Sequence, residues 1–155
     1  MKLVEREVFI DAPPAVVYEL LTDETRFVEW MAPIASLNPT PGGEISWTHV
    51  NRDRVVGTFV ELVPDRRVVF TFGWDRPDIQ VPPGSTTVAI DLRPDNGGTH
   101  LRLVHSGLAG PIADAHDGGW NNYLARLAVV ATGHDPGPDP LAEEPVPSAH
   151  SLGLA

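Results

Sequence analysis

The middle of the chain alternates apolar and polar residues with a period of two. From Gly43 to Ser106, short alternating runs are separated by clusters rich in Pro, Gly, Asn and Asp at residues 51–53, 64–65, 82–84 and 94–98. Successive side chains of a strand point to opposite faces of a sheet, so this period predicts strands rather than helices. The polar breaks predict tight turns between them. The region is therefore expected to form an antiparallel meander.

One face of this predicted sheet is strongly apolar and aromatic, and it needs a cover. A helix from about Asp117 to Thr132 can supply one, because its apolar residues recur at helical spacing and Gly133 is placed to end it. The inward-facing strand residues are Ile45, Trp47, His49, Val55, Gly57, Phe59, Val68, Phe70, Phe72, Trp74, Val88, Ile90, Leu92, Leu101, Leu103 and His105, and the helix stripe is Trp120, Leu124, Leu127 and Ala131.

The start of the chain predicts one more strand and two short helices. An extended run from Val4 to Ile10 is followed by Pro13-Pro14, and Pro suits the first turn of a helix, here expected over Pro14 to Leu21. A second short helix carries Phe27 and Trp30. These elements predict an α+β fold in which a curved antiparallel sheet of about six strands wraps around a long C-terminal helix, with two short helices after the first strand.

Composition changes abruptly at Gly133. Residues 133–155 are rich in Pro, contain no Lys or Arg and show no apolar periodicity. Such a composition predicts disorder, because too little apolar surface is available for burial. The expected organisation is one domain over residues 1–132 and a disordered, Pro-rich acidic tail over residues 133–155. Removing the tail is then expected to leave the melting temperature unchanged.

Bulk properties exclude several functional classes. A length of 155 residues suits one domain, and a formal charge of −10 disfavours nucleic acid and anionic lipid surfaces as partners. The chain has no Cys, which removes disulfides, thiolate metal sites and Cys nucleophiles. Neither a secretion signal nor a membrane span is predicted from the apolar runs. A cytoplasmic location, no membrane association and no cofactor are the resulting expectations.

A series of short motifs follows a recognisable order from Val4 to Thr132. They are Ala12-Pro13 with Val16-Val17-Tyr18, Leu21-Thr22-Asp23 ahead of Trp30, Gly42-Gly43 ahead of Trp47, Gly57 ahead of Pro64-Asp65-Arg66, Val69-Phe70-Thr71-Phe72, Gly98-Thr99 ahead of Leu101-Arg102-Leu103, His105, Gly107-Leu108 and Gly119-Trp120. This order and spacing resemble the SRPBCC or START-like helix-grip superfamily, and within it the branch named for the activator of the heat-shock protein 90 ATPase. One departure is Met31, where the family usually has a second aromatic residue after the Trp.

The resemblance implies a helix-grip fold with a shared internal cavity, but not a reaction, since this superfamily includes lipid carriers, polyketide cyclases, resistance proteins and co-chaperone domains. Aromatic residues between sheet and helix could line such a cavity or simply form an ordinary core. The residues predicted to contact a ligand are Phe27, Trp30, Trp47, Phe59, Phe70, Phe72, Trp74, Leu103, Trp120, Tyr123 and Leu124.

Few residues suggest catalysis. His49 and His105 are the candidate general bases, although a hydrogen-bonded structural histidine is the favoured interpretation of each. His116-Asp117 falls at the expected start of the last helix, where Asp is a natural N-cap. Glu44 and Asp75 lie next to Trp47 and Trp74, but a position at a strand end favours solvated charges. No nucleophile elbow, phosphate loop or helical zinc motif is found in the sequence.

Three functional hypotheses remain open. The first and favoured one is a protein that binds a hydrophobic small molecule, aromatic or polycyclic, in an internal cavity. The second is an enzyme of the cyclase or hydrolase kind that uses the same cavity, although the sequence shows no convincing catalytic motif. The third, implied by the name of the family branch, is a partner protein of the chaperone-ATPase-activator kind. A homodimer is a further option, because an edge strand could support one.

Overall fold

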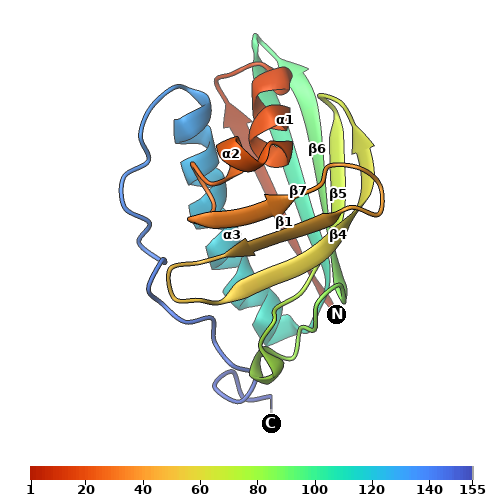
Figure 1. The fold of residues 1–155 in the computed structure, drawn as a ribbon, viewed down its shortest axis with the longest axis vertical. Helices are drawn as coiled ribbons and strands as arrows, with labels where there is room; N and C mark the ends of the chain where they lie inside the picture. The colour runs from red at the N-terminus through yellow and green to blue at the C-terminus, as the bar shows by residue number, and fades with distance from the viewer. Residues whose placement is uncertain (155) are drawn as a thin grey trace.

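Seven antiparallel strands form one curved sheet that wraps around a long helix (Figure 1). This computed structural model describes residues 1–154. In sheet order the strands run β1-β7-β6-β5-β4-β3-β2, so β2 to β7 form a continuous meander. The first strand, β1, pairs with β7 at one edge of the sheet. Their bounds are β1 Lys2–Ile10, β2 Ile34–Leu37, β3 Glu44–Thr48, β4 Arg54–Val63, β5 Arg67–Phe72, β6 Thr86–Asp95 and β7 Gly98–Leu108.

Residues 1–154 contain seven strands where about six were expected, and the additional strand is β2. Its four residues pair with β3 from Ile34 opposite Thr48 to Leu37 opposite Ile45. A run this short shows only two periods of alternation, too few to distinguish it from a loop. The α+β class, the curved antiparallel sheet and the helix-grip arrangement are confirmed.

Two short helices follow β1, as predicted: α1 spans Pro14–Thr22 and α2 spans Glu24–Phe27. Pro14 occupies the first turn of α1, where its missing N–H leaves no bond unmade. Asp23 then separates the helices and caps α2, since its Oδ1 accepts the backbone N–H of Thr25 at 2.9 Å. A 3₁₀ turn, η1, spans Pro77–Ile79 between β5 and β6.

The long helix α3 spans Gly110–Ala131, so it begins seven residues before the expected start at Asp117. Pro111 lies in the first turn, a position that favours proline. The expected start was placed too late because Asp117 followed by two glycines also resembles the beginning of a helix. Asp117 consequently lies inside the helix and is no N-cap. Its carboxylate instead receives two hydrogen bonds from the Arg6 guanidinium of β1, at 2.7 and 2.8 Å.

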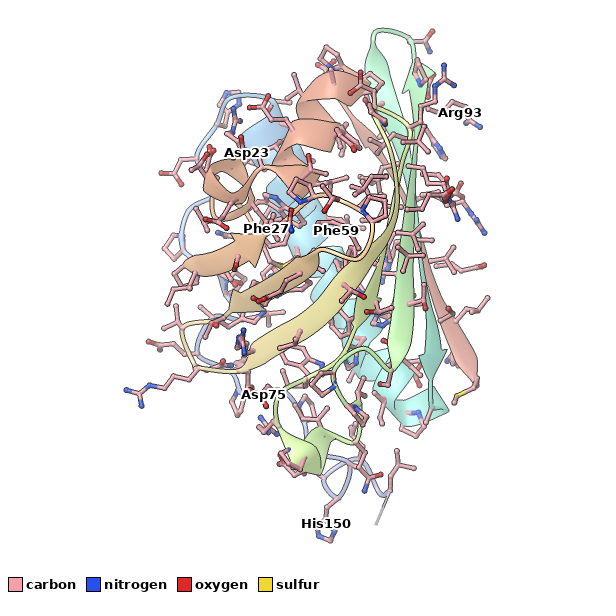
Figure 2. The ribbon with its side chains drawn as sticks, turned by 45° about the vertical axis from the view of Figure 1, so that its right-hand side comes forward. Asp23, Phe27, Phe59, Asp75, Arg93 and His150 are labelled. Atoms are coloured by element: carbon pink, nitrogen blue, oxygen red, sulfur yellow. The ribbon has the colours of Figure 1, made fainter. Side chains whose placement is uncertain are left out.

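One end of the molecule has a solid core. There α1 packs against α3 and the sheet, α2 packs against α1 and β2, and Phe27 and Phe59 lie in the interior (Figure 2). Trp30 is almost completely buried, and its indole N–H donates to the carbonyl oxygen of Leu20 at 2.8 Å. This satisfied donor makes Trp30 a structural residue that joins α1 to the segment after α2.

Residues 133–154 contain no helix or strand and run back along α3 toward its N-terminal end (Figure 1). The backbone N–H of Val146 donates to Asp53 at 3.0 Å, while the carbonyl oxygen of Val146 accepts from Arg76 at 2.7 Å. Ala149, which is fully buried, donates its N–H to the carbonyl oxygen of Asp78 at 2.7 Å. In the structure these contacts therefore join residues 133–154 to the domain, whereas the composition predicts a tail that does not pack. Its disorder in solution stays a prediction from composition.

Candidate ligand-binding cavity

An aromatic cavity of about 370 Å³ lies between the inner face of the sheet and the N-terminal half of α3, and it opens to the outside. The C-terminal segment, residues 133–154, forms the remaining wall of the cavity. This volume falls within the range of small-molecule sites. The lining residues are Met31, Trp47, His49, Asn51, Val55, Phe72, Trp74, Ala115, His116, Gly118, Gly119, Trp120, Tyr123, Leu141, Glu144, Pro145, Val146 and Pro147.

Three tryptophan rings surround Phe72 in the wall of this cavity. Their ring centroids lie 5.8 Å from that of Phe72 for Trp47, 5.7 Å for Trp74 and 6.2 Å for Trp120. The three indoles come from β3, from the residue pair after β5 and from α3, so both sheet and helix are needed to assemble them. Aromatic pairs at these separations attract one another and hold the ring positions fixed.

Each of these three indoles donates its N–H to a histidine. The donor–acceptor distance is 3.1 Å from Trp47 to His49 Nε2, 2.9 Å from Trp74 to His116 Nε2, and 3.0 Å from Trp120 to His105 Nδ1. Buried indole N–H groups require a partner, and here a neutral imidazole supplies it every time. The indole donors are therefore already used within the protein.

These bonds fix the tautomers of the two deepest histidines. Because His105 Nδ1 accepts from Trp120, its proton lies on Nε2, which is 2.8 Å from Thr86 Oγ1. His116 accepts at Nε2, so its proton lies on Nδ1, 2.8 Å from the carbonyl oxygen of Ile112. Burial lowers the pKa of His105 to about 3, with His116 adding to the decrease. Burial also lowers the pKa of His116.

The third histidine belongs to a chain of polar groups at the mouth of the cavity. His49 Nδ1 lies 3.4 Å from the hydroxyl of Tyr123, which donates to Asp139 at 2.6 Å. Burial raises the pKa of Tyr123, and its bond to Asp139 raises it further. Burial opposes ionisation of Asp139, but its hydrogen bonds from Tyr123, Leu141 and Asn122 outweigh that effect and lower its pKa. Asp139 is thus a charged group of the C-terminal segment that is bonded to the lining residue Tyr123 but does not itself line the cavity.

The cavity has little capacity for proton transfer. A general base needs a free lone pair within reach of the substrate, whereas both ring nitrogens of His105 and of His116 are engaged. Glu44 and Asp75 do not line the cavity: both contact Arg54, and their side chains are 53% and 63% exposed. Among residues 1–154 no cluster of three or more His, Asp or Glu side chains could hold a metal ion.

Two adjacent glycines create part of the cavity volume. Gly118 and Gly119 lie inside α3 and line the cavity, and a Cβ atom built on either would meet no atom within 4 Å. Packing therefore does not require glycine here. Each helical glycine costs about 1 kcal/mol relative to alanine. A side chain at either position would occupy open space next to the cavity, which the two glycines leave free.

The sequence matches the family of activator of Hsp90 ATPase homolog 1-like proteins over residues 11–132. The chain belongs to this family. A solved member, the AHSA1-like protein of Rhizobium etli, is 45% identical, and the match covers 90% of this chain and 87% of that one with a TM-score of 0.69. No curated protein matches the chain.

More distant solved structures share the fold alone. DynU16, a protein in the dynemicin biosynthetic locus, is 24% identical with a TM-score of 0.76; the match covers 90% of this chain but only about half, 51%, of DynU16. The Aha1 dimer from Colwellia psychrerythraea is 20% identical with a TM-score of 0.73, and the match covers 84% of this chain and 96% of that one. A homodimer is thus seen in one protein of this fold.

In this family member the structure divides the predicted ligand contacts into two groups. Trp47, Phe72, Trp74, Trp120 and Tyr123 line the cavity together. The others are buried in the solid core and do not line it: Phe27, Trp30, Phe59, Phe70, Leu103 and Leu124. Period-two alternation identifies the inner face but not the position along it, which explains why both groups were selected. The roles of these residues in ligand binding stay predictions.

Several cavity residues were not anticipated. His116 was assigned to a helix start, yet it is buried inside α3 and holds Trp74. Its place three residues before Gly119 and four before Trp120, on the apolar stripe, was the signal that could have revealed it. Leu141 and the residues 144–147 also line the cavity, and their Pro-rich composition gave no such signal.

No helix among residues 1–154 is long and apolar enough to cross a membrane.

Proposed function

We propose that this protein binds a hydrophobic small molecule, aromatic or polycyclic, in the cavity beside α3. The observation that carries the proposal is the ring of Trp47, Trp74 and Trp120 around Phe72, left open where Gly118 and Gly119 lack side chains. A cavity retained at a cost in helix stability is better explained by an occupant than by packing. Apolar burial would supply the affinity.

The polar groups support binding rather than turnover. The indole and imidazole groups satisfy one another, so a ligand would meet preorganised aromatic faces and would not have to displace protein hydrogen bonds. The cyclase or hydrolase hypothesis would need a free acid or base, and the buried histidines have none to offer. The chaperone-partner hypothesis and the homodimer remain predictions, supported only by relatives.

Filling the cavity should abolish binding without harming the fold. In Gly119→Phe the new side chain projects into open space, so binding of the neutral fluorescent probe N-phenyl-1-naphthylamine should weaken at least tenfold. Gly119→Ala is the matched control: it also removes the helical glycine, with a larger gain in helix propensity than phenylalanine gives, but it removes little volume and should bind nearly as wild type. Probe fluorescence gives the dissociation constants, and thermal melting verifies that both variants fold.

Two results would contradict the proposal. One is equal probe affinity in wild type and Gly119→Phe, which would place the probe elsewhere. The other is a wild-type protein that binds no probe and whose native mass spectrum, from its own host, shows no retained small molecule.

A further inference from the structure

The cavity wall contains no cationic side chain. None of the lining residues, all of them within the described part of the chain, is Lys or Arg, while the exposed Glu144 belongs to the lining. Asp139 adds a second carboxylate at the mouth through its bond to the Tyr123 hydroxyl. An anionic ligand would find no charge partner here, and burying an unpaired charge is strongly unfavourable.

Two of the nearby arginines, Arg76 and Arg126, are already occupied. Arg76 donates to Asp53, to Asp78 and to the carbonyl oxygen of Val146. Arg126 donates to two backbone carbonyl oxygens, those of Trp30 and Gly137. The C-terminal segment has acidic residues but no Lys or Arg, and the whole chain carries a formal charge of −10. The acidic C-terminal segment and the net charge of the chain therefore favour cations over anions near the cavity.

The indole hydrogen bonds strengthen the negative faces of the aromatic rings. An indole that donates its N–H to an imidazole nitrogen is polarised, and electron density moves into its ring. All three indoles around Phe72 are bonded this way. Trp is also the side chain whose π face attracts a cation most strongly, at separations up to about 6 Å from the ring centroid.

We propose that the ligand carries a positive charge, as a protonated amine or quaternary ammonium group on an apolar or aromatic body. The proposal rests on the proposed function and specifies the ligand class for the same cavity. The apolar body fills the space beside Gly118 and Gly119, and the ammonium group lies against the indole faces toward Glu144 and Asp139. Carboxylate-bearing lipids and other anions are the class that this cavity rejects.

The test compares two probes of the same shape that differ in charge, phenyltrimethylammonium and tert-butylbenzene. Their dissociation constants are measured with the full-length protein by calorimetry and by tryptophan fluorescence. We expect the cation to bind at least tenfold more tightly than its neutral counterpart, although the neutral probe has the larger hydrophobic driving force. In Glu144→Gln this preference should fall at least threefold. Glu143→Gln removes the same charge next door, from a residue outside the lining, and should change it less.

The outcomes separate this proposal from the function on which it rests. If both probes bind and both are lost in Gly119→Phe, but the neutral probe binds as tightly as the cation or more tightly, the cation proposal is overturned and the hydrophobic site stands. If the two Glu variants reduce the preference equally, Glu144 does not contact the cation as proposed, and the overall charge explains the selectivity. Binding of neither probe would overturn the cation proposal, and N-phenyl-1-naphthylamine binding with the native mass spectrum would then decide whether the hydrophobic site stands.

Discussion

At the scale of single residues, the three Trp–His pairs have consequences for stability as well as for the cavity. Each imidazole accepts a hydrogen bond from an indole through a nitrogen that must stay unprotonated. Protonating that nitrogen would break the bond and place a cation in the protein interior. The fold therefore stabilises the neutral form of histidine, most strongly at the fully buried His105.

This preference predicts a loss of stability in mild acid. The pKa of His105 is about 3 in the folded protein and 6.5 as the ordinary value, so its contribution is complete above pH 6.5 and is lost as the pH falls toward 3. Between pH 7 and pH 5 the free energy of unfolding should fall by about 2 kcal/mol from His105 alone, since the unfolded chain takes up the proton. Urea denaturation across this range measures the decrease.

The variant His105→Gln identifies the source of that decrease. Glutamine can still accept from Trp120 and donate to Thr86 but does not titrate, so the dependence on pH should become shallower by the same amount. Replacing the exposed His150 with Gln is the control and should preserve the wild-type slope. Parallel losses in wild type and His105→Gln would assign the acid sensitivity to other groups.

At the scale of secondary structure, the elements that the sequence predicted correctly are those determined by neighbouring residues. Turn clusters and alternation located most strands, and Pro14 located α1. The start of α3 was misplaced because Gly118-Gly119 suggest a helix boundary, whereas in the fold their missing side chains leave cavity space. The path of the C-terminal segment depends on distant partners, Asp53 and Arg76, which no local pattern in the tail could reveal.

The contacts of that segment lead to a different expectation from its composition. Ending the chain after Gly133 removes the backbone hydrogen bonds of Val146 with Asp53 and Arg76. It also removes the buried Ala149 and the carboxylate that accepts the hydrogen bond of Tyr123. We expect the melting temperature to fall by about 4–8 °C, which corresponds to roughly 2 kcal/mol for a domain of this size. Differential scanning calorimetry measures the change.

A double-mutant cycle tests whether the lost stability comes from these contacts. Arg76→Ala should cost more in the full-length chain than in the shortened one, because only the first retains the carbonyl oxygen of Val146 as a partner. Equal costs in both backgrounds, together with an unchanged melting temperature on truncation, would instead support the disordered tail that the composition predicts.

At the scale of the whole molecule, the sheet holds α3 differently at its two ends. The C-terminal half of the helix lies beside α1 at the solid core (Figure 1). Leu127 of this half is fully buried. The N-terminal half borders the cavity and contains both helical glycines. One continuous helix therefore joins a tightly packed region to a region that borders a cavity. The two regions should open locally at different rates.

Hydrogen–deuterium exchange followed by mass spectrometry can resolve the two halves as separate peptides. Amides in the second half, around Leu124 to Val130, should exchange at least tenfold more slowly than those in Gly110 to Gly119, because opening the second half exposes tightly packed core. A ligand in the cavity should slow exchange in the first half selectively, since binding stabilises only the closed state there. Uniform protection along α3, unchanged by a bound probe, would show that the helix unfolds only as a unit and that the cavity end is as rigid as the core.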